Sequence, residues 1–143
     1  MPADISKHCD TIEECYEFML AYAAQGLRNE EGSASGGQVR EYLERAVKAI
    51  SGLAENCAMA LKHGRWEPVE RYQAFFEVLD RDSHDSIAAI ELVLAQSTIS
   101  SQLIDNLNAS IHLRALLTDM FLVSEIVDMQ QISVNRAGPN SQK

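Results

Sequence analysis

The fold is decided by the stretch VREYLERAVKAISGLAENCAMALKH, residues 39–63. Its apolar residues recur at alternating steps of four and three, the spacing of a single helical face. They are Val39, Leu43, Ala46, Ile50, Leu53, Cys57 and Ala60. Lys62, His63 and Gly64 then supply the cations and the glycine typical of a helix C-terminus. The spacing predicts an amphipathic helix with Ile50 in the middle of a buried seam.

Upstream of this helix, residues 28–37 are rich in glycine and serine and predict a loop. Before the loop, Thr11 and Glu14 match a capping box, which predicts that a first helix begins at Thr11. The apolar face of that helix is expected to consist of Ile12, Tyr16, Met19, Ala23 and Leu27.

Downstream, Pro68 is expected to open a third helix, since proline is well tolerated at a helix start. Residues 69–137 contain neither glycine nor proline, so polarity alone indicates where helices end. Residues 80–86 are a first weak point, and residues 96–101 are the better candidate for a turn because Ser and Thr compete for backbone groups. A last helix is expected from about Ser100 to Gln130.

These helices predict an all-α fold, an antiparallel bundle of about four helices. Two long helices in place of four short ones are the structural alternative. A chain of 143 residues has the size of one domain. We therefore expect a single helical-bundle domain over residues 1–131 and a disordered tail over residues 132–143, where Gly138 and Pro139 lie.

The chain is acidic, with 21 Asp and Glu against 12 Lys and Arg and a net charge of −9. Such a surface repels phosphate, which argues against binding to nucleic acid or to an anionic membrane. The N-terminus lacks the apolar core of a secretory signal, and no stretch is apolar enough to span a membrane. Three cysteines without CxxC spacing indicate reduced thiols, and hence a cytoplasmic protein.

The sequence predicts neither a bound metal nor a cofactor. Di-iron bundles need Glu-x-x-His, but the residues three before the histidines are Ile5, Ala60, Arg81 and Ala109. The thiols and imidazoles that remain, His8, Cys9, Cys15 and His63, lack the tight spacing of a zinc site. Cys15 and Cys57 are instead interpreted as core residues.

Two groups of residues carry the alternative, catalytic hypothesis. Asp80 and His84 are four residues apart and share a helical face, where the carboxylate would raise the pKa of the imidazole for acid–base work. His112 with Arg114 resembles the mid-helix histidine and following basic residue of histidine phosphotransfer proteins. That resemblance is short, and Ala115 stands where the family carries a glycine. It implies a phosphoryl-accepting role for His112.

The last helix favours a different function. Its apolar residues spread over most of its circumference, which exceeds the single stripe needed to pack a surface helix. The sequence leaves two explanations for these apolar residues: burial in the core of the chain, or contact with another chain. Phe121, which lies on the polar arc of the helix, favours contact. The expected interface residues are Leu116, Met120, Phe121, Leu122, Val123 and Ile126. We therefore predict a non-enzymatic adaptor, regulator or assembly factor, a homodimer with a further, unidentified protein partner.

Overall fold

The computed structural model describes the backbone of residues 2–64 and 66–141 and the side chains of residues 4–64 and 66–130. Within these ranges the chain is all-helical, as predicted. The structure has five helices rather than four. They are α1 (Pro2–Ala24), α2 (Val39–His63), α3 (Val69–Leu94), α4 (Ser101–Ala109) and α5 (Ile111–Ser141).

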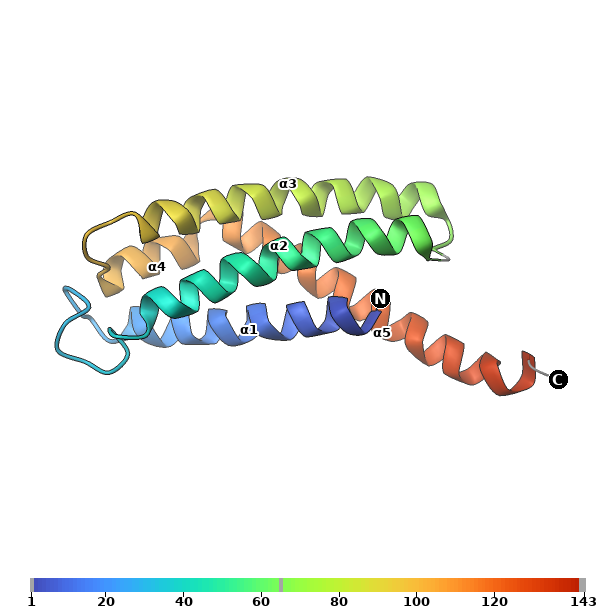
Figure 1. Cartoon of the computed structure of the whole chain (residues 1–143), viewed down its shortest axis with the longest axis horizontal. Helices are drawn as coiled ribbons and strands as arrows, with labels where there is room; N and C mark the ends of the chain where they lie inside the picture. The colour runs from blue at the N-terminus through green and yellow to red at the C-terminus, as the bar shows by residue number, and fades with distance from the viewer. Residues whose placement is uncertain (1, 65, 142–143) are drawn as a thin grey trace.

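The helices form a bundle in which α1, α2 and α3 lie side by side (Figure 1). The short α4 and the long α5 follow one another along the remaining side. Helix α1 packs against α2, α4 and α5, and α3 packs against α2, α4 and α5. The predicted helical bundle is confirmed, and the fifth helix arises because two consecutive helices occupy the position of the fourth.

Helix α2 matches its prediction. Every residue of the predicted seam is buried, and Ile50 is 1% exposed. The helix ends at His63, and the next residue, Gly64, caps it by donating its backbone N–H to the carbonyl of Ala60 at 2.6 Å. Pro68 precedes the first residue of α3, as expected. The predicted loop is also present: residues 25–38 separate α1 from α2, and Gly26 and Gly32 adopt positive φ angles of 68° and 92°.

The predicted start of the first helix at Thr11 is wrong. Helix α1 begins at Pro2, and the Thr11 hydroxyl donates to the carbonyl of Lys7 at 3.1 Å inside the helix. Ile5 and Cys9 are 0% and 1% exposed, so burial of this first part against the bundle outweighs the local capping signal.

The buried face of α1 also differs from the expectation. Ile12 and Met19 are buried as predicted, but Cys15 and Tyr22 are buried in place of the partly buried Tyr16 and Ala23. The hydroxyl of Tyr22 donates to the carbonyl of Ile99 at 2.6 Å. That bond lets a tyrosine occupy the core without an unpaired polar atom.

The weak point at residues 80–86 does not interrupt α3. Ser83 and Ser86 face the interior there, and Leu79 and Ile90 are fully buried on either side. The predicted turn at residues 96–101 is present, since α3 ends at Leu94 and α4 begins at Ser101. Small buried serines and flanking apolar anchors thus keep α3 continuous through a polar stretch.

The predicted single last helix is divided at Ser110. This residue has extended backbone angles, and its hydroxyl accepts a hydrogen bond from the N–H of Leu113 at 3.3 Å, so it caps α5. Asn108, buried just before the break, donates from Nδ2 to the carbonyl of Met19 at 3.2 Å. Helix α5 continues past the predicted end near Gln130 to Ser141, so the backbone of residues 132–141 of the predicted tail belongs to this helix, and residues 142–143 lie outside the described residues.

Candidate functional site

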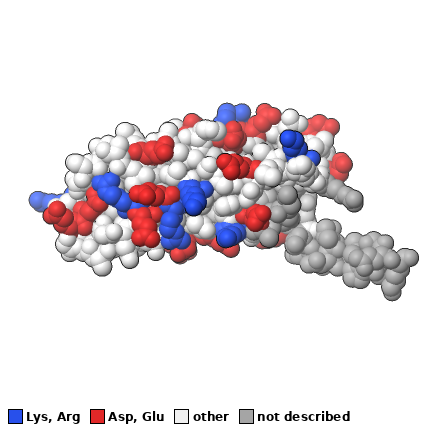
Figure 2. Space-filling model, viewed as in Figure 1, with Lys and Arg blue, Asp and Glu red and all other residues white. Residues whose placement is uncertain are grey.

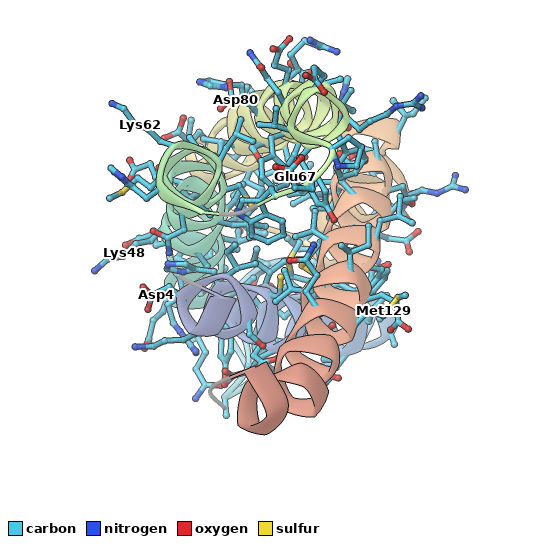
Figure 3. All side chains as sticks on the ribbon, turned by 90° about the vertical axis from the view of Figure 1, so that its right-hand side faces the viewer. Asp4, Lys48, Lys62, Glu67, Asp80 and Met129 are labelled. Atoms are coloured by element: carbon cyan, nitrogen blue, oxygen red, sulfur yellow. The ribbon has the colours of Figure 1, made fainter. Side chains whose placement is uncertain are left out.

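Four apolar residues on α5 form the candidate contact surface, here named the α5 strip: Phe121, Leu122, Ile126 and Met129. Phe121, Leu122 and Met129 are 52%, 49% and 59% exposed, and Ile126 is half-buried. Leu122, Ile126 and Met129 follow the i, i+4, i+7 spacing that aligns side chains along one helical face. Met129 projects from the outer side of α5 (Figure 3). The strip is an apolar surface that no other described helix covers.

The other three residues of the predicted interface are placed differently. Leu116, Met120 and Val123 are 0%, 0% and 3% exposed and belong to the core of the chain itself. The wide apolar circumference of α5 thus serves two surfaces. Its inner side packs on the bundle, and the α5 strip lies on its outer side.

An aromatic pocket adjoins the α5 strip. Trp66 and Tyr72 pack with ring centroids 4.9 Å apart, and Phe75 lies beside them. Ile126 of the strip lines this pocket of about 110 Å³, and Arg71 stands at its edge. Tyr72 is held by Gln130 of α5, whose Nε2 donates to the Tyr72 hydroxyl at 2.8 Å. The pocket has room for one apolar side chain from another molecule.

The Asp80 and His84 pair lies on the outer surface of α3. Their side chains are 57% and 77% exposed, and His84 Nδ1 lies 3.6 Å from Asp80 Oδ2 and 2.9 Å from the Asp80 carbonyl oxygen. Helix α3 therefore does bring the two together. Both residues line a hollow of about 240 Å³ between α2 and α3, but their exposed side chains remain in contact with water there.

His112 and Arg114 are exposed, and the structure places His112 second in α5. The resemblance to a phosphotransfer protein implies a histidine in the middle of a helix, and this implication is wrong. The backbone of His112 has a structural contact, since its carbonyl accepts a hydrogen bond from Ser86 at 2.9 Å. That bond joins the start of α5 to α3.

A buried carboxyl group was missed by the sequence reasoning. Asp119 of α5 is only 7% exposed, and its Oδ2 makes no hydrogen bond within the described part of the chain. Burial, and then the neighbouring carboxyl group of Asp82 of α3, raise the pKa of Asp119 to about 7. The only signal in the sequence is an acidic residue within the apolar stretch of the last helix, and it looks like a surface residue until the position of α3 is known.

The thiols and imidazoles do not form a metal centre in the described part of the chain. Over those residues, no three His, Cys, Asp or Glu side chains come together to hold an ion. Cys9, Cys15 and Cys57 are buried free thiols, which confirms the core interpretation of Cys15 and Cys57. Burial raises the pKa of Cys9 and of Cys57 to about 12, so both remain protonated and unreactive at neutral pH. None of the described helices combines the length and the apolar character that crossing a membrane requires.

Fold and surface together define a class: an all-helical bundle that presents an apolar strip and an adjoining aromatic pocket on its last helix. Comparison of the chain with protein-family models, with curated protein sequences and with solved structures gives no match.

Proposed function

We propose that this chain is a non-enzymatic protein-contact module, an adaptor, regulator or assembly factor of the cytoplasm, and that it forms a twofold homodimer through the α5 strip. The observation that carries the proposal is the exposure of Leu122 and Met129 on the face of α5 whose third residue, Ile126, lines the aromatic pocket, together with the exposure of the neighbouring Phe121. Large apolar side chains gathered on one face and next to a pocket favour a contact with protein. A twofold axis would cover the same strip on both copies.

The acidic surface supports the same function. With a net charge of −9, the chain is unsuited to nucleic acid and to anionic lipid, and it favours protein partners that carry basic groups. The exposed histidines give little support to a catalytic function, because neither His84 nor His112 lies in an enclosed site. Histidine phosphotransfer by His112 remains the alternative, supported by the exposure of its ring and by the nearby Arg114.

The test of the dimer is the oligomeric state of wild type and Leu122→Glu, measured by light scattering at micromolar concentrations. We expect a dimer for the wild type and a monomer of unchanged helix content for Leu122→Glu, since Leu122 is half exposed in one chain. Leu92→Glu is the matched control, because Leu92 is 66% exposed on α3, away from the strip. A monomeric wild type, or a Leu122→Glu variant that stays dimeric, would contradict the proposal.

The alternative function is tested separately, by incubation with a radiolabelled phosphoryl donor. Wild type that takes up no label supports the non-enzymatic function. Label that is acquired by wild type and lost in His112→Gln would establish phosphotransfer instead.

A further inference from the structure

Basic residues gather around one hollow between α1 and α2, here named the α1/α2 hollow. It has a volume of about 380 Å³ and is lined by Lys7, His8, Thr11, Arg45, Lys48 and Ala49. The chain has 12 Lys and Arg against 21 Asp and Glu, yet three cations and no carboxylate are among these lining residues. Figure 2 shows basic side chains over neighbouring stretches of α1 and α2, near the middle of the molecule. The hollow is therefore a basic site on an acidic protein.

The cations of the hollow are largely uncompensated. Lys7 and Lys48 are exposed, and neither forms an ion pair within the described part of the chain. Arg45 pairs with Glu14 through one contact of 3.0 Å, from Nη2 to Oε2, and its guanidinium lies over the ring of Tyr42, 5.0 Å from the centroid. These two contacts hold the guanidinium in place and leave its Nε and Nη1 groups without a partner among the described residues. Three cations against the one carboxylate of Glu14 give the hollow a net charge of +2.

The packing of His8 shapes the hollow. Its imidazole lies against α2 at Gly52, where a Cβ would be 2.5 Å from Cε1 and 2.7 Å from Nε2 of His8. Glycine is less favourable than alanine inside a helix, so the residue at position 52 is explained by the space that it leaves for this ring. Ala49, three residues earlier, is small and 4% exposed, and it forms the apolar floor of the hollow. Small residues of α2 thus keep space open among the cations.

The charge and the openness of the hollow indicate the chemistry of its ligand. A phosphate monoester carries a charge of about −1.5 to −2 at pH 7 and three acceptor oxygens, which match a net charge of +2 better than a single carboxylate does. A polyanion such as RNA would extend beyond the hollow onto the acidic surface and be repelled. All lining residues belong to α1 and α2, so no third described helix covers a ligand, whereas sites for small molecules enclose most of the ligand. These observations favour a phosphoryl group carried by a larger molecule.

We propose that the α1/α2 hollow binds the phosphoryl group of a phosphorylated serine or threonine of a partner protein, between the cations of Lys7, Arg45 and Lys48. Glu14 and Glu44 border the hollow, since each lies one helical turn from a lining residue of its own helix. The residues that flank the phosphorylated residue in the partner are therefore expected to be basic. This inference adds a second contact to the proposed protein-contact function and rests on it. The hollow shares no residue with the α5 strip.

The experiment measures binding of labelled peptides to the full chain by fluorescence anisotropy. The probe is a pool of short peptides with a central phosphoserine and degenerate flanking positions, and the matched pool has serine at the centre. We expect the phosphoserine pool to bind at least about tenfold more tightly, because its phosphoryl group adds charge-assisted hydrogen bonds. Within the phosphoserine pool, peptides with basic flanking residues should bind more tightly than peptides with acidic ones. Equal affinities of the two pools would overturn the proposal.

A matched pair of variants locates the site. Lys48→Gln should weaken binding of the phosphoserine pool about fivefold, because it removes one charge-assisted contact. The control is Lys62→Gln, the same change at another exposed lysine of α2, which projects from the helix at a separate place in Figure 3. Lys62 lies 14 residues further along α2, about 20 Å away and beyond the Debye length of about 8 Å, so its loss should change affinity less than about twofold. Equal effects of the two variants would overturn the proposal.

Two competitors identify the molecule that carries the phosphoryl group. Free O-phosphoserine should displace the peptides only at concentrations at least about tenfold above the Kd of the pool, since it lacks the flanking contacts. Displacement at that Kd would assign the hollow to a small molecule and overturn the assignment to a partner protein, and so would displacement by RNA of random sequence. Leu122→Glu should bind the phosphoserine pool as wild type does, and Lys48→Gln should keep the oligomeric state of wild type. Failure of the hollow and failure of the α5 dimer are therefore observed separately.

Discussion

The guanidinium of Arg40 forms a two-point ion pair with Glu30, from Nε to Oε2 and from Nη2 to Oε1, each at 2.8 Å. Arg40 belongs to α2, and Glu30 lies in the loop between α1 and α2. The same guanidinium donates to the carbonyls of Leu94 and Gln96, and Glu30 Oε1 accepts from the N–H of Ile99. One partly buried pair therefore ties the loop and the turn after α3 to α2.

Loss of this pair is expected to destabilise the fold. Arg40→Ala removes four hydrogen bonds and leaves the Glu30 carboxylate, 21% exposed, without its cation. We expect a loss of about 2 kcal/mol in the free energy of unfolding, measured by urea denaturation. The matched control is Arg45→Ala, because Arg45 pairs with Glu14 through one 3.0 Å contact between exposed side chains, and its loss should lower the stability less than the loss of Arg40 does. Equal losses in the two variants would show that the Arg40 network contributes nothing beyond a surface pair.

The Asp82 and Asp119 pair predicts a pH dependence of stability. Folding raises the pKa of Asp119 from 3.8 to about 7, so the folded state binds this proton more tightly than the unfolded chain. The stability contributed by this group is full below pH 3.8 and is lost as the pH rises to about 7.

Asp119→Asn replaces the carboxyl group with a neutral amide that can still donate to Asp82. We expect this variant to be more stable than wild type at about pH 8, and the difference to shrink at about pH 5, where the wild-type carboxyl is largely protonated. Urea midpoints at the two pH values provide the measurement. Asp105→Asn, an exposed change on α4, is the control and should shift neither midpoint. A difference between Asp119→Asn and wild type that is the same at both pH values would refute the shifted pKa.

The two buried serines of α3 are expected to respond in opposite directions to the same change. Ser83→Ala removes a hydroxyl that has no partner in the described structure, so stability should stay the same or rise by up to about 1 kcal/mol. Ser86→Ala removes the donor to the carbonyl of His112 and should lower stability by about 1 kcal/mol. Thermal melts of both variants test this. A Ser83→Ala variant as destabilised as Ser86→Ala would mean that the Ser83 hydroxyl is paired in solution.

The cysteines predict slow alkylation of the native protein. All three thiols are buried, and burial raises the pKa of each above its ordinary value. Because the thiolate is the reactive form, iodoacetamide at about pH 8 should modify none of them while the chain is folded. Mass spectrometry should find three adducts after denaturation in urea, since the sequence contains three cysteines. Rapid modification of folded protein at Cys9 or Cys57 would contradict their burial.

The sequence by itself determined the features that depend on neighbouring residues along the chain. Four such features specify local backbone geometry: the unbroken apolar spacing of α2, Gly64 after it, Pro68 before α3, and the glycine-rich loop between α1 and α2. These features were predicted because helix period, proline and glycine act within a few residues. The burial of Ile50 follows from the same spacing, since the centre of an apolar seam faces the core wherever the helix packs.

Only the tertiary structure decided which local signals prevail. The capping box at Thr11 is overridden because Ile5 and Cys9 are buried by other helices, and the polar stretch of α3 stays helical because Ser83 and Ser86 fit the interior. Leu116 and Leu122 are the same residue type on the same helix, yet one is 0% and the other 49% exposed. Burial raises the pKa of Asp119, and Asp82 raises it further from a position 37 residues away in the sequence, which pattern alone does not place beside it. Burial is a property of the neighbours that cover a side chain, and those neighbours come from distant segments that only folding brings together.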